Sequence, residues 1–263
     1  GRYFNHNVHS VRVLDDMVNW NISLQTLDGI LCHNGELELK EYRPCDMSTF
    51  VEYDKKVEAC YVDEKAIGEL IPCTLEGCVM RICDIIAYLG KDRQDAMRLN
   101  LLKESPFTAG AIGTSNGEII NNFSVNIIEN SYGKDYLKMD EEYFDALRQA
   151  KKENYEMIYN NKSLNDLYEN EIRPMFGELY EELLRQAESG DKSSVFYRHH
   201  MAYMEKNNFY VKSHVRKPYA EQEKNQLVVD YLASMTDDYF IALYHYLFPK
   251  GKHDVKFVGY FDL

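Results

Sequence analysis

Residues 81–96, RICDIIAYLGKDRQDA, carry Asp84, Tyr88 and Asp92 at successive intervals of four residues. A step of four residues in an α-helix advances about 40° beyond a full turn, so these side chains share nearly one face over roughly 12 Å of axis. Apolar residues occupy most of the other directions: Ile82, Cys83, Ile86, Ala87 and Leu89. The pattern predicts a helix that is buried on most sides, with the polar row along the wall of a pocket. The alternative is a helix whose acidic stripe faces solvent.

The composition is that of an ordinary globular chain of 263 residues, with 45% hydrophobic and 28% charged residues. The net charge of −13 argues against unspecific nucleic-acid binding by bulk charge. No apolar run approaches the roughly 20 residues of a membrane span, so we expect a cytoplasmic protein without membrane association. The six cysteines include no CxxC pair, and we expect reduced, mostly buried thiols.

Helical periodicity recurs along the chain, whereas alternating strand and helix patterns are absent, so we predict a mainly α protein. Ser23, Thr74 and Thr236 are the predicted N-caps of three helices. A Gly- and Ser-rich loop over residues 105–117 separates two predicted regions, 1–110 and 111–263, which could also form one continuous domain. We predict one proline kink near Pro174 and one short β hairpin, between residues 208–215 and the C-terminal VKFVGYFDL.

Four segments together resemble HD-domain phosphohydrolases of the deoxynucleoside triphosphate triphosphohydrolase (dGTPase-like) family. The segment 75–96, LEGCVMRICDIIAYLGKDRQDA, resembles that family's last metal-ligand helix. The other three are FNHNVHSVRVLDDM at 4–17, NISLQTLDGILCHNGE at 21–36 and VVDYLASMTDDYFIALYHYLF at 228–248, and they occur in family order. The resemblance implies part of an HD-domain-like helical bundle, followed by additional C-terminal helices.

The resemblance also implies a divalent metal ion. Family members hold the metal through one His, an adjacent His-Asp pair and a distant Asp, and Asp84 matches the last of these. The other three ligands would precede residue 1, because His253-Asp254 lies outside the motif order. We therefore expect the metal (Mg, Mn, Zn, Ni, Co or Fe) to be weakly held or absent in this chain.

Family positions beside the phosphates and the sugar match three further residues. His6 matches a histidine that contacts the phosphates or donates a proton to the leaving oxygen. Tyr88 and Asp92 match positions that line the deoxyribose. The alternatives are a helix-start histidine with local hydrogen bonds, and an Asp92 that pairs with a surface cation such as Lys91 or Arg93.

The segment KKENYEMIYNN at 151–161 resembles a family helix that reaches the triphosphate, sugar and base. Lys151 aligns with its basic residue, Tyr159 with its tyrosine and Asn160 with its amide residue. A solvated Lys-rich face with a core tyrosine is the alternative. The remaining histidines are given no role in chemistry; we expect His33, His199 and His200 to be structural or surface residues.

The function that the resemblance implies is hydrolysis of deoxynucleoside triphosphates to deoxynucleoside and triphosphate, by a homo-oligomer of which this chain is the C-terminal portion. Because three ligands are missing, we expect the chain alone to hydrolyse little. Two alternatives stay open. One is a non-catalytic module for nucleotide sensing or oligomer assembly, and the other is an HD phosphohydrolase of a different nucleotide phosphate ester.

Overall fold

Helix α4 (Leu75–Arg98) carries the predicted acidic row, and it begins where the sequence predicts. The side chain of Thr74 accepts a hydrogen bond from the N–H of Gly77 at 3.0 Å and so caps the helix. The structure, a computed structural model, describes residues 2–18, 20–33, 38–102, 106–207 and 218–255. Within these residues the chain is mainly α-helical, which confirms the predicted fold class. No described helix combines the length and the apolar character that crossing a membrane requires.

The chain divides into two units. Unit 1 comprises Gly1–Arg12 and Asn21–Asn161, and unit 2 comprises Val13–Trp20 and Lys162–Leu263. The predicted division between residues 110 and 111 therefore falls inside unit 1. The physical reason is that α4 packs against α5 (Asn116–Ser131), on the other side of the predicted loop.

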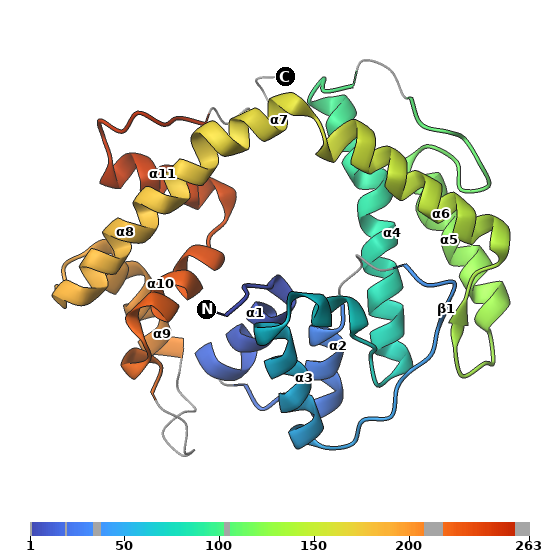
Figure 1. The fold of residues 1–263 in the computed structure, drawn as a ribbon, viewed down its shortest axis with the longest axis horizontal. Coiled ribbons are helices and arrows are strands. Elements are labelled where there is room, and N and C mark those ends of the chain that lie inside the picture. Colours follow the sequence, from blue (N-terminus) through green and yellow to red (C-terminus); the bar gives the residue numbers. More distant parts are fainter. Residues whose placement is uncertain (1, 19, 34–37, 103–105, 208–217, 256–263) are drawn as a thin grey trace. The chain divides into compact units, whose positions relative to one another are not determined.

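Unit 1 is built around α4, with α5 and α6 along it and α1 to α3 beside its N-terminal part (Figure 1). Its other elements are α1 (His6–Arg12), α2 (Leu24–Leu31), α3 (Phe50–Val62), the 3₁₀ helix η2 (Glu64–Glu69), α6 (Glu141–Asn154) and the π-helical η3 (Tyr155–Tyr159). The side chain of Ser23 accepts from the N–H of Thr26 at the start of α2, so this predicted N-cap is confirmed.

One core of unit 1 lies between α4, α5 and α6. Ile82 and Leu89 of α4 are buried there with Phe123 of α5 and Leu147 of α6. The prediction that α4 is buried on most sides is wrong for one direction, because Cys83 and Ala87 are exposed. These two positions are four residues apart, so they share a helix face that faces away from this core.

A two-stranded antiparallel sheet adds a short link that the sequence did not predict. Strand β1 (Glu41–Tyr42) pairs with β2 (Leu137–Lys138), with Glu41 opposite Lys138. Two-residue strands carry too little alternation to be recognised from the sequence. The predicted hairpin lies almost entirely outside the described residues.

Unit 2 packs its helices around α8 (Arg173–Ser189), which runs beside α10 (Lys224–Ala233) and α11 (Asp237–Leu247) (Figure 1). Its core includes Leu179, Leu183, Phe196, Leu227 and Tyr244. The remaining elements are the π-helical η1 (Val13–Met17), η4 (Tyr168–Ile172) and η5 (Phe196–Met201), with α7 (Lys162–Leu167), α9 (Ala202–Asn207) and the 3₁₀ helix η7 (Tyr219–Glu221).

Two predicted local features of unit 2 have counterparts in the structure. The side chain of Thr236 accepts from the N–H of Tyr239, which confirms this residue as the N-cap of α11. Pro174 lies in the first turn of α8, directly after π-helical η4. A proline lacks the N–H that would continue the helical hydrogen bonds, so the regular α-helix is interrupted before it.

Candidate functional site

A cavity of about 750 Å³ lies beside α4, and all of its lining residues belong to unit 1. Asp84 and Tyr88 project into it from α4, so the predicted row borders a cavity at these two positions. Asp84 is half-buried, and the ring of Tyr88 is 58% exposed. The other lining residues are His6, His33, Ile85, Leu89, Lys151, Asn154, Tyr155 and Tyr159.

Lys151 brings the positive charge to this cavity from α6. It forms an ion pair with Glu38, and both side chains are less than a third exposed. Burial acts to raise the pKa of Glu38, but the hydrogen bond and charge of Lys151 lower it by more, so the pKa falls below its usual value. An anionic ligand in the cavity would therefore compete with Glu38 for the ammonium group.

Two imidazole rings lie side by side in the cavity wall. The ring centroids of His6 and His33 are 5.1 Å apart, with the planes at 70°. Nδ1 of His33 lies 2.5 Å from the carbonyl oxygen of Ile30, so Nδ1 carries the hydrogen and Nε2 is free to accept when the ring is neutral. His33 was predicted to be structural or a surface residue, yet it also belongs to the cavity.

Asp92, the third residue of the predicted row, reaches the site through a tyrosine. The hydroxyl of Tyr159 donates a hydrogen bond to the Asp92 carboxylate. Burial raises the pKa of Tyr159, and the nearby Asp92 charge raises it further, so the phenol stays protonated. Lys91 pairs instead with Asp95, and Arg93 with Glu153, so the alternative partners weighed for Asp92 are engaged elsewhere.

Two predicted site residues do not line the cavity: Asp92, which contacts the lining residue Tyr159, and Asn160. Asn160 is exposed, and its backbone N–H closes η3 on the carbonyl oxygen of Tyr155. Asn154 supplies an amide instead. Asn154 and Tyr155 lie three and four residues after Lys151, so the same helical spacing that relates Lys151 to Tyr159 could have identified them.

The walls of the cavity are joined by a buried polar cluster behind Asn154. The amide of Asn154 donates to the carbonyl oxygen of Leu89 at 3.0 Å and accepts from Nε of Arg93 at 2.8 Å. Arg93 also bonds the carbonyl oxygen of Ala150 and the carboxylate of Glu153, each at 3.2 Å. These contacts fix α6, with Lys151, against α4, with Asp84 and Tyr88.

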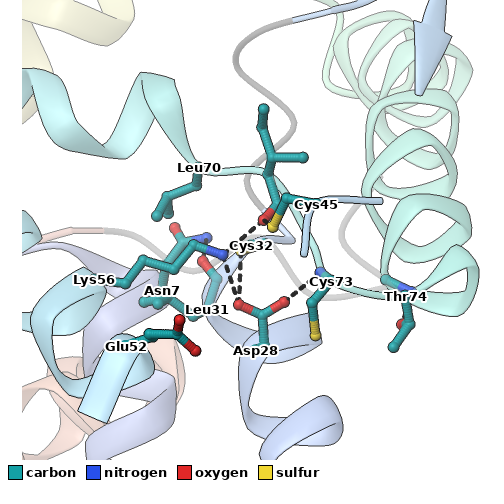
Figure 2. A network of polar contacts seen from close by, with 12 residues as sticks. Asn7, Asp28, Leu31, Cys32, Cys45, Glu52, Lys56, Leu70, Cys73 and Thr74 are labelled. Carbon is teal, nitrogen blue, oxygen red and sulfur yellow. Dashed lines mark hydrogen bonds and ion pairs between the residues drawn. The ribbon is translucent and has the colours of Figure 1, made fainter. Parts of the chain in front are cut away.

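A second buried network fixes the segment that leads into α4 (Figure 2). Asp28 on α2 is fully buried and accepts hydrogen bonds from Nζ of Lys56 and from the backbone N–H of Cys73, both at 2.6 Å. Lys56 also donates to the carbonyl oxygen of Ile71 at 2.6 Å. The network therefore holds α2 and α3 to the residues that precede the Thr74 cap.

Comparison with known proteins adds independent support for the resemblance. The Phosphohydrolase-associated domain matches residues 137–246. A deoxyguanosinetriphosphate triphosphohydrolase-like protein of Clostridium tetani is 25% identical over 260 residues, which cover 94% of this chain and 60% of that protein. The protein of the same name from Clostridium perfringens is 26% identical over 249 residues, covering 90% and 58%. A third, from Caldanaerobacter subterraneus subsp. tengcongensis, is 27% identical over 181 residues, covering 67% and 47%.

These matches support the resemblance to the deoxyguanosinetriphosphate triphosphohydrolase-like family over most of the chain. It spans about three fifths of the length of the first two of these relatives. No solved structure matches the chain.

The described residues of this chain do not by themselves fit a divalent metal ion. Among them, no group of three His, Cys, Asp or Glu side chains could hold one. Asp84 offers a single carboxylate, whereas catalytic metal sites combine at least three protein ligands in most enzymes. All six cysteines are free thiols, and the pKa of Cys32, Cys73 and Cys78 is raised first by burial, to about 12, 11 and 11 respectively.

Proposed function

We propose that this chain is part of a metal-dependent HD phosphohydrolase that hydrolyses a deoxynucleoside triphosphate such as dGTP to deoxynucleoside and triphosphate. The observation that carries the proposal is the single cavity that gathers His6, Asp84, Tyr88, Lys151 and Tyr159. The names of the relatives support the substrate class. We further propose a cytoplasmic homo-oligomer, which sedimentation of the purified protein would test.

Each lining residue has a role that its chemistry allows. Hydrolysis adds water across the bond between the α-phosphorus and the 5′ oxygen, and the leaving oxygen takes up a proton. His6 is the proposed donor, because an imidazole ordinarily titrates near neutral pH. Lys151 would neutralise phosphate charge. A metal at Asp84 would need ligands beyond the described residues, so we assign it no step.

The nucleoside would lie against the tyrosines. The Asp92 carboxylate accepts a hydrogen bond from Tyr159 and has further lone pairs for a sugar hydroxyl. The exposed ring of Tyr88 stands one helical turn before Asp92 and would leave little room for a 2′-hydroxyl. Asn160, which lies outside the cavity wall, stays a proposed base contact that only a nucleotide complex can test.

Lys151→Gln is expected to weaken binding of inorganic triphosphate and of dGTP by at least about tenfold. Hydrogen bonds to charged groups contribute about 1.5–3 kcal/mol each, and glutamine lacks the positive charge. Isothermal titration calorimetry measures both ligands. Lys152→Gln is the matched control, because Lys152 is the next residue of α6 and is 66% exposed. Unchanged affinity in Lys151→Gln would rule out this residue as the phosphate contact.

The 263-residue chain is expected to bind dGTP but to release little product, because the described residues supply only Asp84 as a metal ligand. Chromatography of a reaction with dGTP and Mn²⁺ detects deoxyguanosine and triphosphate. Appreciable metal-dependent turnover by this chain would contradict the expectation. Release of a different phosphate product would favour the phosphohydrolase of another ester.

Among the described residues, no group of three side chains could hold a metal ion. This also favours a second candidate function, that of a non-catalytic module that senses nucleotides or assembles oligomers. Thermal stabilisation by dNTPs without product formation, in the longest natural form of the protein, would support this candidate over the hydrolase. Product formation there would exclude it.

A further inference from the structure

A groove on unit 2 has no role in the proposed reaction. It consists of two adjoining hollows of about 580 and 320 Å³, which share Arg198, His199 and Tyr239 as lining residues. We call it the η5–α11 groove, because η5 and α11 contribute residues to both hollows; residues of η1, α9 and α10 complete the larger one. Volumes of this order are typical of small-molecule sites.

Four tyrosines contribute to the lining of the η5–α11 groove, among valine, methionine and other aliphatic side chains. Tyr231 and Tyr239 stand in the wall, with their hydroxyl oxygens 2.6 Å apart. Tyr203 lines the larger hollow and Tyr246 the smaller one, and these two side chains are 59% and 65% exposed. Aromatic faces that are left open to water favour the stacking of a planar ring, which contributes about 1–3 kcal/mol per nucleic-acid base.

Arg198 places a positive charge in the middle of the groove. Its side chain lines both hollows and is exposed, and within the described residues its guanidinium has no carboxylate partner. No acidic residue lines either hollow; Asp237 and Asp238 lie in the first turn of α11 but are not part of the lining. In a chain with a net charge of −13, an unpaired arginine between tyrosines is suited to one anionic group.

The wall of the groove is held by a buried hydrogen-bond chain. Tyr219 donates to the carboxylate of Asp230 at 3.0 Å, so its oxygen accepts from Nε2 of His200 at 2.8 Å. The His200 ring stacks on Tyr231 at 4.7 Å between centroids. Burial lowers the pKa of His200 to about 4, although Asp230 acts to raise it, so the ring is neutral at pH 7. These hydrogen bonds therefore fix the Tyr231 ring, through the stacked His200, without adding a positive charge to the groove.

The backbone of η5 contributes a second feature. Arg198, His199 and His200 lie in a π-helical stretch, and such stretches occur frequently at functional sites. His199 is tied to the opposite side, since its Nδ1 lies 2.8 Å from the hydroxyl of Tyr239. The η5–α11 groove is thus preorganised from both sides, which lowers the entropy cost of binding.

We propose that the η5–α11 groove binds an aromatic molecule with one anionic group, of the nucleoside monophosphate class. The base would stack on the tyrosine rings, and the phosphate would pair with the guanidinium of Arg198. The hydroxyls of Ser234 and Thr236, which line the larger hollow, would meet the sugar or phosphate. This site is separate from the α4 cavity, and it does not rest on the proposed hydrolase function.

Calorimetry of the 263-residue chain with dGMP, deoxyguanosine and inorganic phosphate tests the proposal. We expect dGMP to bind more tightly than deoxyguanosine alone or inorganic phosphate alone, because both its base and its phosphate contribute to binding. Arg198→Gln should weaken dGMP binding about tenfold or more. Arg185→Gln on α8 is the matched control, because Arg185 is 68% exposed and lies outside the groove, and it should change the affinity less than twofold.

Lys151→Gln separates this site from the α4 cavity. If dGMP binding survives Lys151→Gln and falls with Arg198→Gln, the groove is the site. If it falls only with Lys151→Gln, or if dGMP does not bind at millimolar concentration, the inference is overturned and the proposed hydrolase function is untouched. Photolabelling with 8-azido-dGMP gives a readout that does not depend on variants: labelled peptides should contain Tyr203 or Tyr239, and label confined to unit 1 would contradict the proposal.

Discussion

Unit 1 is expected to lose about 3–5 kcal/mol of stability when Arg93 is replaced by methionine. Arg93 and Glu153 are only 2% and 5% exposed, and Nη2 of Arg93 lies 3.2 Å from the Glu153 carboxylate. Methionine fills the space beside Phe107, whose ring centroid lies 4.0 Å from the guanidinium carbon. It leaves the Glu153 carboxylate buried without its cation, however, and although Thr108 and Gln149 still donate hydrogen bonds to it, a buried charge without its counter-charge is strongly destabilising.

Hydrogen exchange of the backbone amides in α4 and α6 measures this loss in unit 1 alone, independently of unit 2. Arg148→Met is the matched control, because Arg148 lies on α6 but is exposed; we expect a change within about 0.5 kcal/mol. The double variant Arg93→Met, Glu153→Gln removes the stranded charge and should recover part of the loss. Arg93→Met with the exchange rates of the unchanged chain would show that the buried pair does not hold α6 to α4.

Local patterns in the sequence were enough to predict the parts of the fold that depend on neighbouring residues. Ser23, Thr74 and Thr236 accept the predicted backbone hydrogen bonds, because an N-cap needs only a side-chain oxygen before a helical segment. The spacing of Asp84 and Tyr88 placed both on one cavity, because four-residue steps keep a helix face.

Features that depend on distant residues could not be predicted in this way. Glu38 meets Lys151 across more than a hundred residues of sequence, and His33 reaches the cavity through the end of α2. Arg93 has the sequence context of a surface cation, next to Lys91 and Asp92. It is buried because its partners come from α6, which no spacing within 81–96 reveals. The same holds for Asp28, whose partners lie on α3 and in the segment before α4.

Asp28→Asn is expected to lower the free energy of unfolding of unit 1 by about 3–5 kcal/mol. The Asp28 side chain is fully buried, while that of Lys56 is 19% exposed. Burial acts to lower the pKa of Lys56, but interactions with Cys32 and Asp28 raise it by more, so the pKa of Lys56 in the folded chain lies above its unfolded value. The charged lysine therefore contributes its full stabilisation below the unfolded pKa, and the contribution is lost as the pH rises through the folded pKa. At pH 7 the Asp28→Asn replacement therefore removes the carboxylate that pairs with the charged form of Lys56.

Urea unfolding at pH 7, followed by hydrogen exchange in α2 and α4, measures the loss, and Asp135→Asn is the control. Asp135 is 87% exposed and 3.4 Å from Arg43, so we expect less than about 0.5 kcal/mol for its replacement. Lys56→Met in the Asp28→Asn background decides the cause. If the stranded ammonium is responsible, the double variant is more stable than Asp28→Asn alone, because the buried charge has gone. If the double variant is less stable still, a stranded ammonium is not the cause, because Lys56 then still stabilises unit 1 through its hydrogen bond to the carbonyl oxygen of Ile71. The Asp28 network would in that case act mainly by fixing the backbone that leads into α4.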